Sequence, residues 1–517
     1  MSARPAAPIL DRYTEIGMLS VTFRGTVRRT LAPLAAGLVV ATAILAYEHI
    51  GGTWAFALIS AGTMAALVVW SGAGTGLPLL PILVVQNLVI YGVPIVASHE
   101  NILTYPTRFV TSAGAEVMVM DVAMALAWWA GMRLFNDRPP VSLVLHEVNK
   151  DGVKGWRRIG FGLISCATVF QVLAGLNLLD AFYGMLPSGG DSLVNALVSV
   201  ISACGFFLVS MVVGAGAAPA AERASFWVLL LVNVLFSASS FLLAGAAACL
   251  LSVAVGLFWG SGRVPWRFLA LALSGLAFFN VGKTTMRARY WGPEESATVN
   301  ISLGQMPGVY AEWCDASVDA LLENRRDAKA TAAHPDLHAV KNQTLLDRID
   351  NLENLLFVID AMETERVTPL RGATYWLIPP LLVPRIFWPD KPRSHEGQVL
   401  LNVHFGRQDL NSTFTTYIAW GLLPEAYGNF GPVTGAVGLG VFLGFLFAWI
   451  EKYTARKLLI SCEGFVCLSL LMNLINSFEM VASVLVTSVF QSLVIVVAAS
   501  LPFVRRVRNP HPDEVES

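Results

Sequence analysis

Long apolar stretches recur along almost the whole chain, each separated from the next by a short polar break. A helix that crosses a bilayer needs about 20 predominantly apolar residues. Stretches of roughly this kind lie at 31–48, 52–71, 77–97, 112–132, 159–178, 192–217, 225–239, 241–259, 268–283, 431–450, 458–476 and 481–503. The run 225–259 is too long for one span, and the small polar break Ser237–Ser240 divides it. The pattern predicts an all-α polytopic membrane protein with about 12 transmembrane helices.

Basic residues in the short loops predict the orientation of these helices. If the N-terminus is cytoplasmic, the inner loops hold Arg133, Arg263 and Lys452 together with other basic residues. The short outer loops then hold only Arg108. Cationic residues of short loops stay preferentially on the cytoplasmic side. With twelve spans both termini are therefore expected to be cytoplasmic, and the polar stretch between spans 9 and 10 is expected outside.

This topology predicts four regions along the chain. Residues 1–283 hold transmembrane helices 1–9, and 284–430 form a large outer segment. Residues 431–503 hold helices 10–12, and 504–517 form a cytoplasmic tail. Composition agrees, because 55% of the residues are hydrophobic and 14% are charged, against about 25% charged in soluble domains. The net charge of −1 gives no general attraction to nucleic acid.

The middle of the outer segment has the spacing of an amphipathic helix. Its apolar positions recur every three or four residues, at Leu345, Ile349, Leu352, Leu356 and Ile359. Thr344 and Asp347 have the spacing of a capping box at its start. We expect this helix to lie on the membrane or on the other helices rather than to carry catalysis. A second helix is predicted over about 310–330.

The stretch Tyr375–Pro392 is apolar but contains five prolines, so it predicts a re-entrant or interfacial segment. It carries Arg385 and Lys391 at the expected edge of the bilayer. Two interpretations remain open. The cations either anchor the segment at the lipid headgroups, or the prolines hold them rigidly as a site for an anionic ligand.

A second irregular stretch, Thr413–Gly435, carries Glu425 next to Tyr427. A carboxylate at a membrane boundary usually faces a cavity or a partner, because entering hydrocarbon is costly. A cap for the helix that follows explains Glu425 equally well. The sequence has no zinc-type Cys or His spacing and no glycine-rich phosphate loop, so no metal and no cofactor is predicted.

Three strings in the outer segment resemble a known family. TPLRGATY (368–375), VPRIFWPDKP (383–392) and PEAYGNFGPVTG (424–435) are similar to the bacterial O-antigen and exopolysaccharide repeat-unit polymerases, the Wzy-type members of the C-type glycosyltransferase superfamily. The residues around 315–345 have no counterpart in that pattern. The resemblance implies an enzyme of the bacterial inner membrane that joins undecaprenyl-diphosphate-linked repeat units by metal-independent, inverting glycosyl transfer. Its expected partners are the lipid-linked donor and acceptor, the bilayer and other polysaccharide assembly proteins.

The resemblance gives candidate residues their roles. A diphosphate leaving group without a metal needs cations, which guanidinium groups supply in bidentate form. The candidates for binding diphosphate or sugar are Arg287, Arg289, Arg371, Arg385, Lys391, Arg407 and Tyr427. The acceptor hydroxyl also needs a base, for which Glu425 and His395 are the candidates. Inversion requires the nucleophile to approach opposite the leaving group, which favours Glu425 as base and leaves His395 to orient phosphate or sugar.

Two other functions fit parts of the pattern. An O-antigen ligase would use the same donor with a different acceptor. A transporter or flippase of lipid-linked oligosaccharide would favour several charged residues within the spans and paired discontinuous helices. Only Glu116, Asp121 and Glu463 lie within predicted spans, and no internal repeat is visible. The sequence therefore favours an enzyme that works on the outer face.

Overall fold

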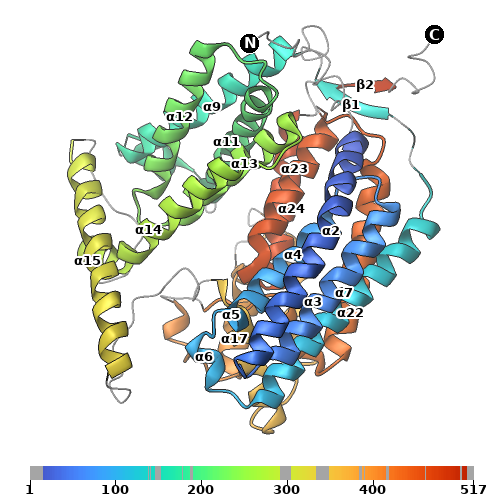
Figure 1. The fold of residues 1–517 in the computed structure, drawn as a ribbon. Helices are drawn as coiled ribbons and strands as arrows, with labels where there is room; N and C mark the ends of the chain where they lie inside the picture. The colour runs from blue at the N-terminus through green and yellow to red at the C-terminus, as the bar shows by residue number, and fades with distance from the viewer. Residues whose placement is uncertain are drawn as a thin grey trace. The chain divides into compact units, whose positions relative to one another are not determined.

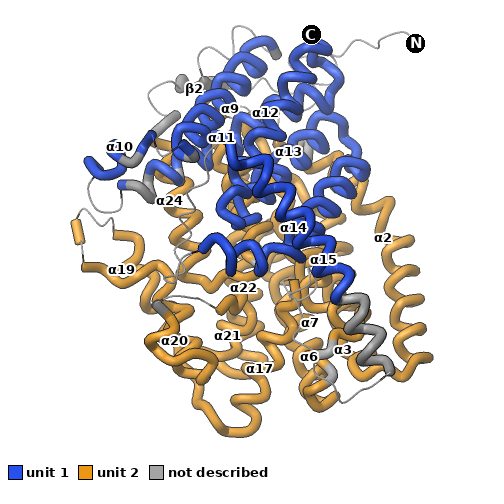
Figure 2. Tube along the Cα trace, turned by 90° about the vertical axis from the view of Figure 1, so that its left-hand side faces the viewer, with its two compact units in different colours: residues 1–11, 147–348 blue, residues 12–146, 349–517 orange. Residues whose placement is uncertain are grey.

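The computed structural model describes residues 16–137, 139, 141–145, 153–176, 178–186, 190–291, 304–333, 349–383, 387–388, 390–414, 418–459, 461–500 and 504–508. The chain folds into two units, each built almost wholly of helices (Figures 1 and 2). Unit 1 comprises residues 1–11 and 147–348, and unit 2 comprises 12–146 and 349–517. The predicted outer segment 284–430 is thus divided between the two units.

Ten helices in the described residues are long and apolar enough to cross a membrane. In unit 2 they are α2 (Ile16–Tyr47), α3 (Thr53–Ala73), the continuous stretch α4–η1–α5 (Leu79–Asn87, Leu88–Gly92 and Val93–Val96), α7 (Thr107–Leu134) and α22 (Thr434–Thr454). In unit 1 they are α9 (Val153–Gly175), α11 (Gly190–Gly214), α12 (Ala220–Ala238), α13 (Leu243–Ser261) and α14 (Trp266–Tyr290). The prediction of an all-α, multi-pass membrane protein is confirmed.

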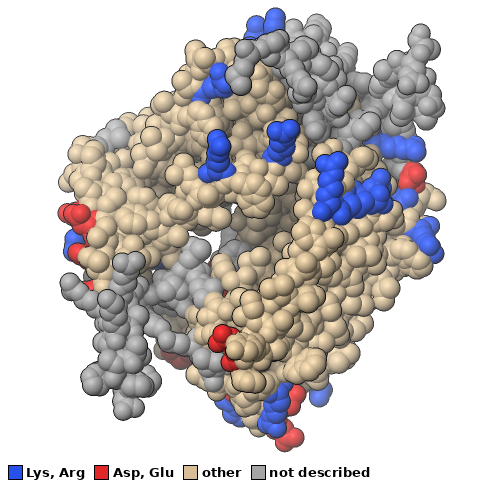
Figure 3. All heavy atoms as spheres, in the orientation of Figure 1, with Lys and Arg blue, Asp and Glu red and all other residues tan. Residues whose placement is uncertain are grey.

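Two further apolar helices, α23 (Cys462–Ile475) and α24 (Ala482–Ser500), occupy the last two predicted spans and are shorter over their described residues. The number twelve and the orientation therefore stay predictions. The division of the run 225–259 is confirmed, because α12 ends at Ala238 and α13 begins at Leu243. Charge is distributed as a bilayer requires. Figure 3 shows a broad uncharged face over the long helices of unit 2, with charged side chains gathered toward its ends.

Unit 1 holds the earlier of the two helices predicted in the outer segment. This helix, α15 (Met306–Ala333), contains the predicted range 310–330 and much of the sequence around 315–345. Its Trp313 is buried against Phe241 and Phe279, and the indole Nε1 donates to the Phe279 carbonyl at 2.9 Å. Trp313 thus fixes α15 against Phe279 of α14, whereas Leu321 and Leu322 of α15 are exposed. The same unit also contains the short helix α10 (Asp180–Met185).

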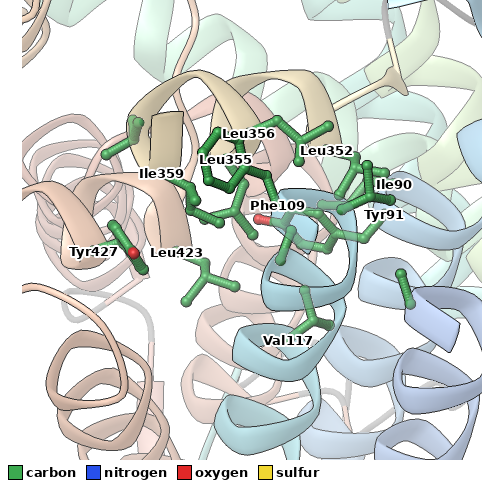
Figure 4. Close-up of a cluster of buried hydrophobic side chains, with 14 of the residues drawn as sticks. Ile90, Tyr91, Phe109, Val117, Leu352, Leu355, Leu356, Ile359, Leu423 and Tyr427 are labelled. Atoms are coloured by element: carbon green, nitrogen blue, oxygen red, sulfur yellow. The ribbon is translucent and has the colours of Figure 1, made fainter. Parts of the chain in front are cut away.

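The second predicted helix of the outer segment is α17 (Leu352–Glu363) of unit 2. Its apolar face, with Leu352, Leu356 and Ile359, is fully buried against α7 and the end of the third span (Figure 4). This packing agrees with the expectation that the helix lies on other helices. Ile349 precedes the helix, and the predicted positions Thr344, Leu345 and Asp347 lie outside the described residues.

A π-helical turn in the third span positions α17. The turn, η1, changes the backbone hydrogen-bonding pattern of the span, and its Ile90 carbonyl accepts a hydrogen bond from the Asn351 backbone N–H at 3.1 Å. Such turns inside helices are frequent at functional positions. Here η1 fixes the start of α17 to the membrane-spanning helices.

The rest of unit 2 consists of short elements. They are α6 (Glu100–Leu103), α18 (Ala373–Trp376), α19 (Ile378–Leu382), α20 (Glu396–His404), η2 (Ser412–Phe414), α21 (Leu422–Phe430) and η3 (Asn476–Glu479). The strands β1 (Val141–Leu145) and β2 (Val504–Arg508) form an antiparallel pair in which Val141 faces Arg508. Sequence analysis predicted no strand in the C-terminal tail. The pair joins segments more than 350 residues apart, which a local pattern does not reveal.

Glu451 of α22 holds together the turn between the second and third spans. Its carboxylate is fully buried and accepts hydrogen bonds from the indoles of Trp70 and Trp128, at 3.1 Å and 2.8 Å. The backbone N–H groups of Thr75 and Gly76 donate to the same carboxylate, at 2.7 Å and 3.3 Å. These backbone groups lie between α3 and α4 and have no helical partner. One side chain therefore satisfies the polar groups of a buried chain break.

We expect Glu451→Gln to destabilise unit 2. A glutamine has one acceptor oxygen and adds two donors, so at least one buried N–H group loses its partner, at a cost of about 1–3 kcal/mol. The thermal unfolding midpoint of the purified protein in detergent should fall. Glu48→Gln is the control, because Glu48 is exposed after α2, and it should leave the midpoint unchanged. Equal midpoints for both variants would contradict this role of Glu451.

Candidate functional site

A large apolar cavity lies within unit 2, along α22. Its volume is about 720 Å³, within the roughly 300–1,000 Å³ of ligand pockets. Along α22 its lining runs from Gly435 to Ile450, which at 1.5 Å per residue is about 22 Å of helix. The opposite wall comes from α23 and α24, and one end is formed by Tyr375, Phe430 and Ala482. The length and apolar lining of the cavity suit a long hydrocarbon chain.

Glu425 lies next to this end of the cavity. Its neighbour Ala426 lines the cavity, and the Glu425 side chain itself is fully buried. The Ala482 backbone N–H donates to Glu425 Oε2 at 2.6 Å. Because Ala482 is the first residue of α24, Glu425 caps that helix at its electropositive end. The sequence suggested a cap for the following helix, α22, whereas the helix that Glu425 caps is α24.

Polar side chains gather around Glu425. Asn429, one turn later in α21, donates from Nδ2 to Thr374 Oγ1 at 2.9 Å and to the Glu425 carbonyl at 2.8 Å. Glu425 Oε1, Asn429 Oδ1 and Ser483 Oγ are buried without a hydrogen-bond partner in the described residues. Buried polar atoms usually have such a partner. These three atoms are therefore available to a buried water, and to a ligand only after the start of α24 has moved.

The surroundings of Glu425 change its acidity. Burial raises the pKa of Glu425 from 4.5 to about 7, against the lowering effects of hydrogen bonds from the Ala482 N–H and the Thr374 hydroxyl. Burial and the nearby Glu425 together raise the pKa of Tyr375 as well. The Tyr375 ring is stacked on Phe430, with ring centres 5.5 Å apart. A carboxyl whose pKa is near 7 exchanges a proton readily at neutral pH, as a general base must.

Arg371, one of the predicted cations, is connected to Glu425 through hydrogen bonds of Asn429. Its backbone N–H donates to the Asn429 carbonyl at 2.8 Å, and its side chain is exposed. Its φ of +51° and that of Gly372, +86°, turn the chain sharply before α18. The guanidinium thus projects from the segment that contributes Thr374 and Tyr375.

Lys391 and Arg407 have structural contacts in unit 2. Lys391 Nζ donates to the carbonyls of Leu381 and Val383, at 2.8 Å and 2.7 Å, which closes the proline-rich segment at the end of α19. Arg407 Nη1 donates to Asn354 Oδ1, and the guanidinium lies 4.5 Å from the centre of the Phe357 ring. Burial lowers the pKa of Arg407. Arg385, the cation on which the proline-rich interpretation most depended, lies outside the described residues.

Arg287 and Arg289 belong to α14 of unit 1. Arg287 donates from Nε and Nη2 to the Phe241 carbonyl, at 3.2 Å and 3.0 Å, which fixes the turn between α12 and α13. Arg289 Nη1 lies 3.6 Å from Glu312 Oε2 of α15, an exposed ion pair.

His395 and Glu425 approach the same helix from different segments. His395 precedes α20, and its Nδ1 lies 2.8 Å from Gln398 Oε1. A β-carbon at Gly397 would lie 2.7 Å from Ser483 Oγ, so α20 passes directly over the start of α24. The start of α24 is also where Glu425 binds. Glu425 and the helix that follows His395 thus meet at one helix end, although the two candidate bases are 30 positions apart in sequence.

Tyr427 faces the other way from the cavity. It is 1% exposed and packs with Leu423 in the hydrophobic core beneath α17 (Figure 4). Burial raises its pKa.

Sequence analysis left Thr374, Asn429 and Ser483 unassigned. The spacing of Glu425 and Asn429, four residues apart, was the available signal for one of them, because it puts both on one helix face.

Comparisons with known proteins add no relative. No protein-family model, no curated protein and no solved structure matches the chain. The resemblance to repeat-unit polymerases therefore stays an expectation from the sequence.

The raised pKa of Glu425 predicts a pH dependence of stability. Because the native pKa of about 7 exceeds the ordinary 4.5, the unfolded chain releases this proton first as the pH rises. The contribution of Glu425 to stability is therefore full below pH 4.5, declines up to about pH 7 and is lost above it. Glu425→Gln should flatten this part of the profile of thermal midpoint against pH. A profile identical to that of the unaltered protein would show that Glu425 titrates normally.

Proposed function

We propose that this protein is a membrane glycosyltransferase that polymerises undecaprenyl-diphosphate-linked oligosaccharide repeat units into O-antigen or exopolysaccharide. The reaction takes place on the periplasmic face of the bacterial inner membrane and does not use a metal. The observation that carries the proposal is the apolar cavity along α22, with a buried polar cluster at one end. A lipid-linked sugar has the same two parts, a long hydrocarbon chain and a polar head.

The cavity supplies a place for the polyprenyl chain. Its walls are aliphatic and aromatic over about the length of α22. Burial of apolar surface contributes about 25 cal/mol per Å², so a chain in this cavity would hold the donor while its head group reacts. The exposed Arg371, on the segment that forms the polar end, is suited to the diphosphate.

The proposed reaction is a single inverting displacement. The acceptor hydroxyl attacks the anomeric carbon of the donor, the new glycosidic C–O bond forms, and the C–O bond to the diphosphate breaks. The electron pair of that bond leaves with undecaprenyl diphosphate, and the hydroxyl proton passes to Glu425. The pKa of Glu425, about 7, suits this transfer. The hydroxyl reaches Glu425 only if the start of α24 moves, because the carboxylate is buried there.

Substitution of Glu425 separates its two roles. Glu425→Gln retains an oxygen that can accept from the Ala482 N–H, so the cap on α24 persists, but the group is no longer basic. Turnover of a purified lipid-linked repeat unit should fall by at least about 100-fold while donor binding persists. His395→Ala is the companion variant and should retain more activity. Normal turnover in Glu425→Gln together with loss in His395→Ala would reverse the two assignments.

Filling the cavity tests the binding of the hydrocarbon chain. Gly438 lines the cavity, and a β-carbon there would meet no atom within 4 Å. Gly438→Leu should fold normally, since leucine favours helices, and should raise the KM for the lipid-linked donor at least several-fold.

Gly37→Leu in α2 is the matched control. A β-carbon at Gly37 also meets no atom within 4 Å, and Gly37 is not among the residues that line the cavity. This variant should keep the KM of the unaltered protein. An unchanged KM in Gly438→Leu would remove the cavity from the donor site.

A further inference from the structure

A cavity of about 370 Å³ lies in unit 1, near the start of α9 and α12, which lie side by side (Figures 1 and 2). It is lined by Arg157, Arg158, Phe161, Ala221, Glu222 and Ser225. Both helices are long and apolar enough to cross a membrane. The cavity therefore lies where a pair of membrane-spanning helices begins, an end that the predicted topology places on the cytoplasmic side.

Arg157 has donors that its ion pair does not use. Its Nε lies 3.2 Å from Glu222 Oε2, which joins α9 to α12. In the described part of the chain its terminal nitrogens, Nη1 and Nη2, have no hydrogen-bond partner. The Arg157 side chain is 23% exposed, so a ligand can reach it through the cavity. A guanidinium held in this way offers two parallel N–H groups, the arrangement that binds a phosphate in bidentate form.

The two helices carry more positive than negative charge at this end. Over α9 and α12 the one acidic residue is Glu222, against the four basic residues Lys154, Arg157, Arg158 and Arg223. The exposed hydroxyl of Ser225 adds a neutral donor to the cavity wall. Basic pockets between membrane-spanning helices on the cytoplasmic side bind the head groups of anionic lipids. The charge of the cavity thus suits an anion.

The surface deeper in the membrane is apolar, as an acyl chain requires. Gly162 follows Arg158 by four residues and Val228 follows Ser225 by three, so each lies one turn further along the same helix face. Val228 is exposed, and a β-carbon at Gly162 would meet no atom within 4 Å. Trp227 is also exposed, in the position of a residue at head-group level. A lipid would use this surface, whereas a free phosphate ion would not.

We propose that the cavity binds the phosphodiester head group of an anionic phospholipid, such as phosphatidylglycerol. Arg157 is the main ligand of the phosphate, and one acyl chain lies along Gly162 and Val228. The bound lipid joins α9 to α12 in addition to the ion pair of Arg157 with Glu222. This site is separate from the glycosyl transfer proposed above, and neither proposal depends on the other.

The test uses the full-length protein, stripped of lipid in a neutral detergent. Phosphatidylglycerol and phosphatidylcholine with identical acyl chains are titrated separately, and bound lipid is counted by native mass spectrometry. The thermal unfolding midpoint is measured in parallel. We expect one phosphatidylglycerol per chain with a saturable rise of the midpoint, and at least about 10-fold weaker binding of phosphatidylcholine. Inorganic phosphate should give no such rise.

Two variants alter the site in different ways. Arg157→Gln removes the charge and the fork, and should weaken phosphatidylglycerol binding at least about 10-fold. Ser225→Leu keeps the ion pair of Arg157 with Glu222 but fills the cavity at an exposed position, so it should fold normally and also weaken binding. Ala224→Leu is its size control, because Ala224 is exposed and does not line the cavity.

Arg223→Gln is the matched control for charge. Arg223 lies next to Glu222, is exposed and does not line the cavity, so this variant should lose clearly less affinity than Arg157→Gln. Equal losses in the two variants would show general attraction to basic residues and overturn the site. Equal binding of the two lipids would overturn it as well. A rise of the midpoint with inorganic phosphate alone would show that the ligand is a free anion and not a lipid.

Discussion

Buried carboxylates satisfy backbone N–H groups at three places where helices of unit 2 begin. In apolar surroundings no water is present to accept a hydrogen bond from an unpaired N–H group. At a break in a helix the acceptor must therefore come from another part of the chain. Glu451 supplies it to the turn before α4, Glu425 to the start of α24, and Glu116 to the junction before α22. Each acceptor comes from a segment distant in sequence. The same hydrogen bonds therefore close the backbone and hold the helices to one another.

This constraint also creates the candidate site. The cap on α24 brings a carboxylate to the end of an apolar cavity, and burial raises the pKa of Glu425 to about 7. The burial that allows Glu425 to cap α24 also removes its carboxylate from water, and this raises the pKa of Glu425 into the range of a general base. The neighbouring Thr374 and Asn429 are fully buried for the same reason. Stability and reactivity at this position are linked, since opening the cap would free the base.

The candidate diphosphate-binding cations show what the sequence could and could not predict about the site. Their charge and outer position made six Arg and Lys residues of the outer segment candidates for binding diphosphate or sugar, but residue type does not reveal a partner. Lys391 closes its own loop, Arg287 binds a carbonyl at a helix turn, and Arg371 remains exposed beside the polar cluster. The fold decides between these roles because a long side chain can reach any acceptor within several ångströms. Only the path of the chain determines which acceptor is there.

The sequence by itself determined the class of protein, ten of the long helices, the break between α12 and α13, the helix α15 and the amphipathic face of α17. These features follow from two local patterns. The length of an apolar stretch determines whether a helix can cross the bilayer, and the periodicity of apolar residues determines which face of a helix is buried. Tertiary structure alone decided the pairing of β1 with β2, the cavity along α22, and the partners of Glu425 and Glu451. Each of these joins residues far apart in the chain. Their contacts depend on how helices pack, and no local pattern of residues encodes that packing.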